Sequence, residues 1–197
     1  MKDLMLAAKL LKCGEIIAAP TDTVYGLLAD ATNESAIQKI YIAKKRPITK
    51  PLIVLVSSIE MAKEFALFDS KSEKIATRFW IDEKKPLTII LKAKNVSKLI
   101  TAGGDTVALR LPKNDFCLEL INGLGKAIVA PSANISGNNT ATSYDMVKND
   151  FRDSLPLIID GGICENLPST IIDLSSGNLN VIRVGAVSNE ELQITKN

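Results

Sequence analysis

Short apolar runs alternate with amphipathic segments along the whole chain, and this alternation restricts the possible folds most. Runs such as 15–19 and 52–56 are typical of buried strands. The spacing of Leu4, Ala7, Ala8 and Leu11 instead predicts a helix over 3–13 that ends at Gly14. The two patterns do not follow a strict βαβ order. We therefore predict an α/β or α+β fold, with helices packed on a mixed sheet.

The other expected elements follow from the same two patterns. Asn33 is the expected N-cap of a helix over 34–45. Helices are expected at 34–45, 59–66, 71–80, 115–122, 143–151 and 188–194. Strands are expected at 87–92, 107–111, 127–131, 157–160, 170–174 and 181–184. The segment 20–26 is predicted to be a strand end and a loop rich in small hydroxyl side chains.

Length and composition predict one domain over 1–197. The chain has 197 residues, of which 46% are hydrophobic and 23% charged, as in ordinary globular domains. No apolar run reaches the ~20 residues that cross a bilayer, and Lys9 interrupts the only stretch that resembles a signal peptide. Cys13, Cys117 and Cys164 are scattered and are expected to be reduced and buried. We expect a cytoplasmic protein.

The chain contains no histidine, and this absence excludes several kinds of chemistry. Ser-His-Asp and Cys-His catalysis are ruled out, and a transition-metal site is improbable on composition. The net charge of +2 is too small to indicate binding of nucleic acid by overall attraction. An anion site would therefore depend on a local cluster of cations.

The densest such cluster is the turn Lys44-Lys45-Arg46-Pro47-Ile48-Thr49-Lys50-Pro51. Its prolines stiffen the backbone, which suits a phosphate clamp. Cations also complement the dipole at the end of a helix, so composition alone favours a solvated helix end over a clamp.

Other polar residues lie at the ends of predicted strands, where α/β sheets tend to bind ligands. The loop Pro131–Gly137 brings Ser132, Asn134 and Ser136 together, either as a binding loop or as an ordinary turn. Arg110 lies within an apolar strand, where it either reaches solvent at a sheet edge or binds an anion. Neither the P-loop nor the dinucleotide-binding glycine motif is present.

Taken together and in this order, six motifs resemble the YrdC-type threonylcarbamoyl-AMP synthase family in its short, single-domain type. They are Pro20-Thr-Asp-Thr-Val-Tyr-Gly26, Lys44-x-Arg46-Pro47, Val107-Ala-Leu-Arg110, Pro131-Ser-Ala-Asn134-x-Ser-Gly137, Ser169-Thr170 and Arg183-x-Gly185. The resemblance implies a twisted mixed sheet around a concave basic cavity, and a single domain without the C-terminal accessory domain of longer members. It also implies that L-threonine, bicarbonate and ATP react to give threonylcarbamoyl-AMP and pyrophosphate, the activated group that a downstream enzyme transfers to tRNA.

The resemblance also assigns residues to the two substrates. Threonine would bind at Thr23, Arg110, Ser132 and Ser169. ATP would bind at Arg46, Lys50, Thr106, Asn134, Thr142 and Arg183, with Lys44 and Arg46 supplying positioning and charge stabilisation. Mg2+ is expected to arrive on the ATP phosphates, with no metal site in the protein.

At two places the sequence differs from the family pattern. Leu55 stands where many members have a histidine that helps to hold threonine, and the Trp-Pro-Gly-Pro-Leu-Thr segment is here Trp80-Ile-Asp-Glu-Lys-Lys-Pro-Leu-Thr88. Two other functions remain open at this point. One is a non-catalytic module that binds double-stranded RNA, and the other is a carbamoyl-adenylate enzyme that acts on another acceptor.

Overall fold

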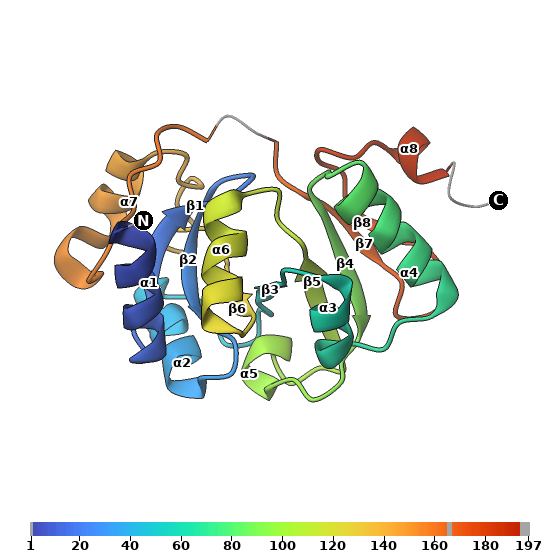
Figure 1. The fold of residues 1–197 in the computed structure, drawn as a ribbon, viewed down its shortest axis with the longest axis horizontal. Coiled ribbons are helices and arrows are strands. Elements are labelled where there is room, and N and C mark those ends of the chain that lie inside the picture. Colours follow the sequence, from blue (N-terminus) through green and yellow to red (C-terminus); the bar gives the residue numbers. More distant parts are fainter. Residues whose placement is uncertain (1, 165–166, 194–197) are drawn as a thin grey trace.

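The computed structural model describes residues 2–164 and 167–193, and its centre is an eight-stranded sheet (Figure 1). Along the sheet the order is β1-β2-β6-β3-β5-β4-β7-β8. Two neighbouring pairs, β3 with β5 and β4 with β7, are parallel, and the others are antiparallel. The strands are β1 (Ile17–Pro20), β2 (Tyr25–Asp30), β3 (Ile53–Leu55), β4 (Leu87–Lys92), β5 (Thr106–Arg110), β6 (Ile128–Val129), β7 (Thr170–Asp173) and β8 (Asn180–Arg183). The predicted mixed sheet is confirmed.

Helices flank the sheet, as predicted. They are α1 (Lys2–Lys12), α2 (Glu34–Ala43), α3 (Ile59–Phe65), α4 (Ser70–Ala76), α5 (Lys98–Thr101), α6 (Asp115–Leu124), α7 (Tyr144–Phe151) and α8 (Asn189–Gln193). Asn33 caps α2, because its side chain accepts a hydrogen bond from the Ala36 amide. None of the helices within residues 2–164 and 167–193 is long and apolar enough to cross a membrane.

Two hydrophobic clusters hold these layers together. In the smaller cluster, α1 and α6 pack beside each other against β1, β2, β3 and β6. In the larger cluster, α2, α4 and α7 pack against those strand side chains that do not enter the smaller cluster. On β5, Val107 and Leu109 enter this larger core, so Ala108 and Arg110 face the opposite side of the sheet. That opposite side carries the cavity described below.

β2 is a strand that the sequence analysis did not predict. All six of its residues are buried, and they alternate between the clusters: Tyr25 and Leu27 enter the larger one and Leu28 the smaller. The strand lacks the β-branched residues that mark most strands and contains Gly26, so its pattern is weak. Its antiparallel pairing with β1 makes the intervening residues 21–24 a tight loop between these two strands.

Three further predictions are corrected. The strand expected at 157–160 is wrong, because this segment forms only an isolated bridge between Ile158 and Ala18 beside the edge strand β1. The helix expected at 71–80 is α-helical only in its first part, because α4 ends at Ala76 and a π-helical turn follows over Thr77–Asp82. Cys13 is exposed because it follows the end of α1, although the cysteines are free as expected.

Candidate functional site

A cavity of about 540 Å³ opens on the sheet face that carries Ala108 and Arg110. Seven of the predicted site residues line it, namely Thr23, Arg46, Arg110, Ser132, Thr142, Ser169 and Arg183. They come from elements far apart in the sequence: the β1–β2 loop, the turn after α2, β5, the loop after β6 and the start and end of the β7–β8 hairpin. The wall therefore combines three arginines with several hydroxyl groups, and no carboxylate lines it among the described residues.

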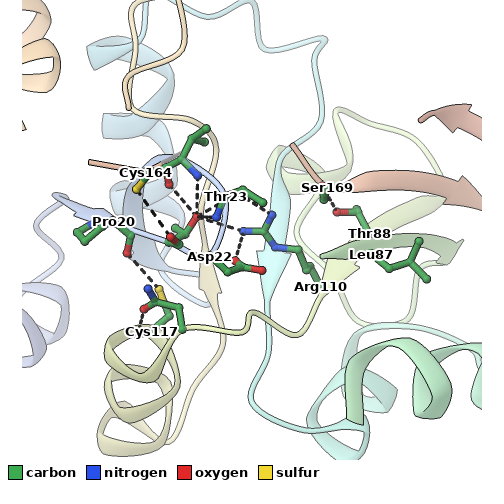
Figure 2. Close-up of polar contacts among 12 residues, drawn as sticks. Pro20, Asp22, Thr23, Leu87, Thr88, Arg110, Cys117, Cys164 and Ser169 are labelled. Atoms are coloured by element: carbon green, nitrogen blue, oxygen red, sulfur yellow. Dashed lines mark hydrogen bonds and ion pairs between the residues drawn. The ribbon is translucent and has the colours of Figure 1, made fainter. Parts of the chain in front are cut away.

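Arg110 is the last residue of β5, a central strand, and is only 5% exposed. Its Nη2 lies 3.0 Å from the Asp22 carboxylate, and its Nη1 donates to Thr23 Oγ1 at 3.1 Å (Figure 2). Nη2 also lies 3.4 Å from Thr21 Oγ1. The alternative in which Arg110 reaches solvent at a sheet edge is therefore excluded. The guanidinium is held at the cavity wall by the β1–β2 loop.

The β1–β2 loop is ordered by its own hydroxyl groups. Thr21 Oγ1 donates to the Val24 carbonyl at 2.7 Å and accepts from the amides of Thr23 and Val24. Side chains of this type stabilise tight turns by replacing backbone partners. As a result, the loop presents the Thr23 hydroxyl and the Asp22 carboxylate in fixed directions toward Arg110.

Ser169 and Arg183 form the opposite wall. Arg183 donates from Nη2 to the Ser169 carbonyl at 2.8 Å, and the Ser169 hydroxyl lies 2.9 Å from Thr88 Oγ1 on β4 (Figure 2). Burial, and secondly the positive charge of Arg110, lower the pKa of Arg183 below its usual value. The mutual repulsion of these two cations would be relieved by an anion bound between them.

Arg46 reaches the cavity from the turn after α2. Its Nη2 donates to the Pro51 carbonyl at 2.9 Å, and burial lowers the pKa of Arg46. Lys45 and Lys50, in the same turn, are exposed and do not line the cavity. The turn therefore directs one of its cations, Arg46, to the site.

Lys44 lies behind the cavity wall rather than on it. The residue is 1% exposed, and its Nζ donates to the carbonyl oxygens of Ser132 and Asn134. Burial lowers the pKa of Lys44 to about 8. The side chain of Asn134 stabilises the same loop, because its amide donates to the carbonyls of Ile135 and Asn138. Both residues hold the loop that carries Ser132.

Thr106 is also outside the cavity wall. It shares the face of β5 with Ala108 and Arg110, but it begins the strand that Arg110 ends. Leu55 is fully buried in the smaller core, so this position offers the cavity no polar group in place of the family histidine.

The sequence analysis missed several residues that shape the site. Thr21 and Asp22 lie inside the motif 20–26, but nothing in the sequence indicated that this loop meets a strand 88 positions later. Thr140 lines the cavity and Thr88 orients Ser169. Thr140 carries no sequence signal, because it lies in an ordinary loop. Thr88 ends the family segment Trp80–Thr88, but that segment does not indicate its contact with Ser169.

A family model described as telomere recombination, the Sua5/YciO/YrdC model, matches residues 9–185. The chain belongs to the Sua5/YciO/YrdC family. Among members of this family, the threonylcarbamoyl-AMP synthase of Pyrococcus abyssi is 40% identical over 95% of this chain and 55% of its own length. The enzyme of the same name from Bacillus subtilis is 37% identical over 95% of this chain and 54% of its own length. The chain thus spans about half the length of these curated relatives.

Solved structures of the Sua5/YciO/YrdC family confirm the predicted fold. The crystal structure of Pyrococcus abyssi Sua5 complexed with L-threonine superposes with a TM-score of 0.92 at 39% identity. The match covers 98% of this chain and 57% of that one. The twisted mixed sheet with flanking helices is therefore the family fold.

Proposed function

We propose that this protein is an L-threonylcarbamoyladenylate synthase, which converts L-threonine, bicarbonate and ATP into threonylcarbamoyl-AMP and pyrophosphate. The observation that carries the proposal is the meeting of Arg110 with the hydroxyl groups of Thr23, Ser132 and Ser169 in one cavity. A guanidinium suits a carboxylate, and hydroxyl groups suit the small polar side chain of threonine. The relatives that carry this name, and the Sua5 structure with bound L-threonine, support the same choice.

In the proposed reaction, bicarbonate gives CO2 and hydroxide, and the neutral amine of threonine attacks the CO2 carbon to form a carbamate. The proton lost from nitrogen combines with the hydroxide to give water. A carbamate oxygen then attacks the α-phosphorus of ATP, and the bond from that phosphorus to the oxygen bridging to the β-phosphate breaks. Pyrophosphate leaves with the electron pair of that bond. This sequence needs no protein nucleophile, so the absence of histidine is no obstacle. Orientation and charge stabilisation are what the protein supplies.

Arg46 and Arg183 are proposed to neutralise the triphosphate, because both are cations at the cavity wall. Thr142 lines the same wall. Lys50, Thr106 and Asn134 are retained as proposed ATP contacts, although none of them lines the cavity. Lys44 is proposed to act through the loop that it holds, by keeping Ser132 in place.

Mg2+ is proposed to enter as the Mg-ATP substrate. No cluster of three acidic, histidine or cysteine side chains that could hold a metal ion occurs in the described part of the chain. The cavity wall offers hydroxyls and guanidinium groups rather than carboxylates. These donors do not form a cage for a resident magnesium ion.

The direct test is release of pyrophosphate from ATP in the presence of bicarbonate, with and without threonine. The proposal predicts pyrophosphate only when threonine is present. Release that depends on a different amino acid or amine would favour a carbamoyl-adenylate enzyme with another acceptor. Absence of turnover, together with binding of duplex RNA, would favour the RNA-binding module.

The proposed product is unstable in water and requires a consumer. A tRNA threonylcarbamoyl-transfer enzyme is the proposed downstream partner, and direct contact of this protein with tRNA is a further proposal. Adding that enzyme and tRNA to the reaction should move label from threonine into tRNA.

A further inference from the structure

The Asp22 carboxylate lies directly behind the cavity wall. Its two neighbours, Thr21 and Thr23, line the cavity, whereas Asp22 itself does not. The residue is 7% exposed and its carboxylate faces the guanidinium of Arg110 (Figure 2). Asp22 is therefore placed to act on Arg110 without touching a ligand in the cavity.

The orientation of Arg110 depends on this loop. One carboxylate oxygen and two hydroxyl groups from residues 21–23 engage both terminal nitrogens of the guanidinium. The Arg110 Nε has no hydrogen-bond partner in the described part of the chain, although the side chain is almost fully buried. The terminal N–H hydrogens that this loop does not engage are left as donors for a bound anion.

Asp22 is also distinctive electrostatically. Among the ion pairs of residues 2–164 and 167–193, Asp22–Arg110 is the one that involves an arginine of the cavity wall. Arg183 carries the same charge as Arg110 and lies close enough for the two to interact. Without Asp22, repulsion from Arg183 and the many rotamers of arginine would both turn the buried guanidinium away from its present direction.

We propose that Asp22 is a positioning residue for amino-acid binding. It holds Arg110 in the orientation in which the guanidinium receives the substrate carboxylate. This inference rests on the proposed function, since threonine is the carboxylate in question. It adds a role for Asp22 that is separate from the direct contacts proposed for Arg110 and Thr23.

Two substitutions separate the geometry of Asp22 from its charge. Asp22→Asn keeps an oxygen acceptor and removes the charge, whereas Asp22→Ala removes both. We expect Asp22→Ala to raise the KM for threonine about tenfold and Asp22→Asn to raise it about threefold, with the KM for ATP changed by less than about twofold. Asp30→Asn is the matched control, because Asp30 is also a buried aspartate paired with a cation, Lys126, but lies outside the cavity.

A double variant tests whether Asp22 acts through Arg110. The Asp22→Ala/Arg110→Ala protein should have the same threonine KM as Arg110→Ala alone, because the positioned group is already gone. If Asp22→Ala does not fold, Asp22→Asn and its double variant with Arg110→Ala carry the same test. A threonine KM that falls or stays within about twofold would overturn the proposal, as would an equal rise in the KM for ATP.

A readout independent of turnover separates this proposal from the proposed function. In 15N-arginine-labelled wild-type protein, NMR should show slowed rotation of the Arg110 guanidinium, and Asp22→Asn should speed it. If the wild type does not use threonine but this change occurs, the proposed function fails and the positioning of Arg110 by Asp22 stands. If the wild type uses threonine but neither the rotation nor the threonine KM responds, the role of Asp22 is wrong.

Discussion

Arg46 and Lys45 are adjacent cations in one turn, yet only Arg46 lines the cavity. Lys45 is exposed and has a positive φ of 49°, so its side chain leaves the turn in a different direction. The density of positive charge in a sequence segment therefore does not identify the functional cation. The direction in which the side chain points identifies it, and the backbone of the turn sets that direction.

Replacement of Arg46 by alanine should reduce kcat/KM for threonine-dependent pyrophosphate release. The expected loss is about 2 to 4 kcal/mol of transition-state stabilisation, as for removal of a charge-assisted contact to phosphate. Steady-state kinetics measure it, and Lys45→Ala is the control from the same turn. A variant that releases pyrophosphate at the wild-type rate would remove Arg46 from the site.

Gly185 lies so close to the backbone of residues 168 and 169 that no side chain fits there. A Cβ at this position would overlap the Pro168 carbonyl oxygen and lie 2.8 Å from the Ser169 carbonyl carbon. Gly185→Ala must therefore displace the backbone that carries Ser169. We expect the KM for threonine to rise about tenfold or more, while Gly123→Ala, which meets nothing within 4 Å, leaves it unchanged. Unchanged threonine KM in Gly185→Ala would contradict this account of the wall.

At the scale of elements, β2 is the strand on which the site depends. It carries one end of the loop that holds Arg110, and it is buried between the two hydrophobic clusters. Its stability therefore comes from packing on both faces rather than from strand propensity.

Leu28→Ala should accordingly lower the free energy of unfolding by about 2 to 5 kcal/mol, since it removes a fully buried side chain and leaves a cavity. Leu6→Ala, on the exposed side of α1, should change it by less than about 0.5 kcal/mol. Chemical denaturation of the two variants measures the difference. Equal values would show that β2 is not a central part of the core.

The elements with strong patterns were predictable, and the weak ones were not. Helix α2 and its cap Asn33 follow from spacing and capping chemistry, and β4 from an apolar run between loops. The strand β2 was missed because it lacks β-branched residues and contains Gly26. The segment 157–160 was wrongly assigned because an apolar run beside an edge strand need not join it. The hydrophobic pattern of a segment shows which of its side chains can be buried, but not which strand or helix the segment packs against.

The same limit applies to the site. The resemblance brought seven of the lining residues to attention, including Arg110, Ser132 and Arg183. It could not show that Asp22 pairs with Arg110, because that contact is made by the topology of the sheet. Nor could it separate Lys44, which is buried behind the wall, from Arg46, which lines it.

At the scale of the whole molecule, the buried Lys44 predicts a pH dependence of stability. Its pKa is about 8 in the folded protein, against 10.5 ordinarily. Below pH 8 the lysine is protonated in both states and contributes no slope. Between pH 8 and 10.5 the unfolded chain binds a proton that the folded protein lacks, so the free energy of unfolding rises with pH, by roughly 2 to 3 kcal/mol over the window.

Denaturation curves at several pH values for the wild type and Lys44→Met isolate this contribution. The stability of the wild type relative to Lys44→Met should increase from pH 8 to 10.5. Lys45→Met, which alters an exposed lysine, should follow the wild type. Parallel curves for the wild type and Lys44→Met would mean that burial does not perturb Lys44.

The central claim is that the cavity joins carboxylated threonine to the α-phosphate of ATP. Mass spectrometry of the product formed from 13C-bicarbonate, L-threonine and ATP tests it most directly, with Arg110→Ala as the control. The account predicts a threonylcarbamoyl-AMP adduct that contains one 13C atom, formed by the wild type and strongly reduced in the control. Pyrophosphate released without such an adduct, or an adduct that lacks the bicarbonate carbon, would contradict it.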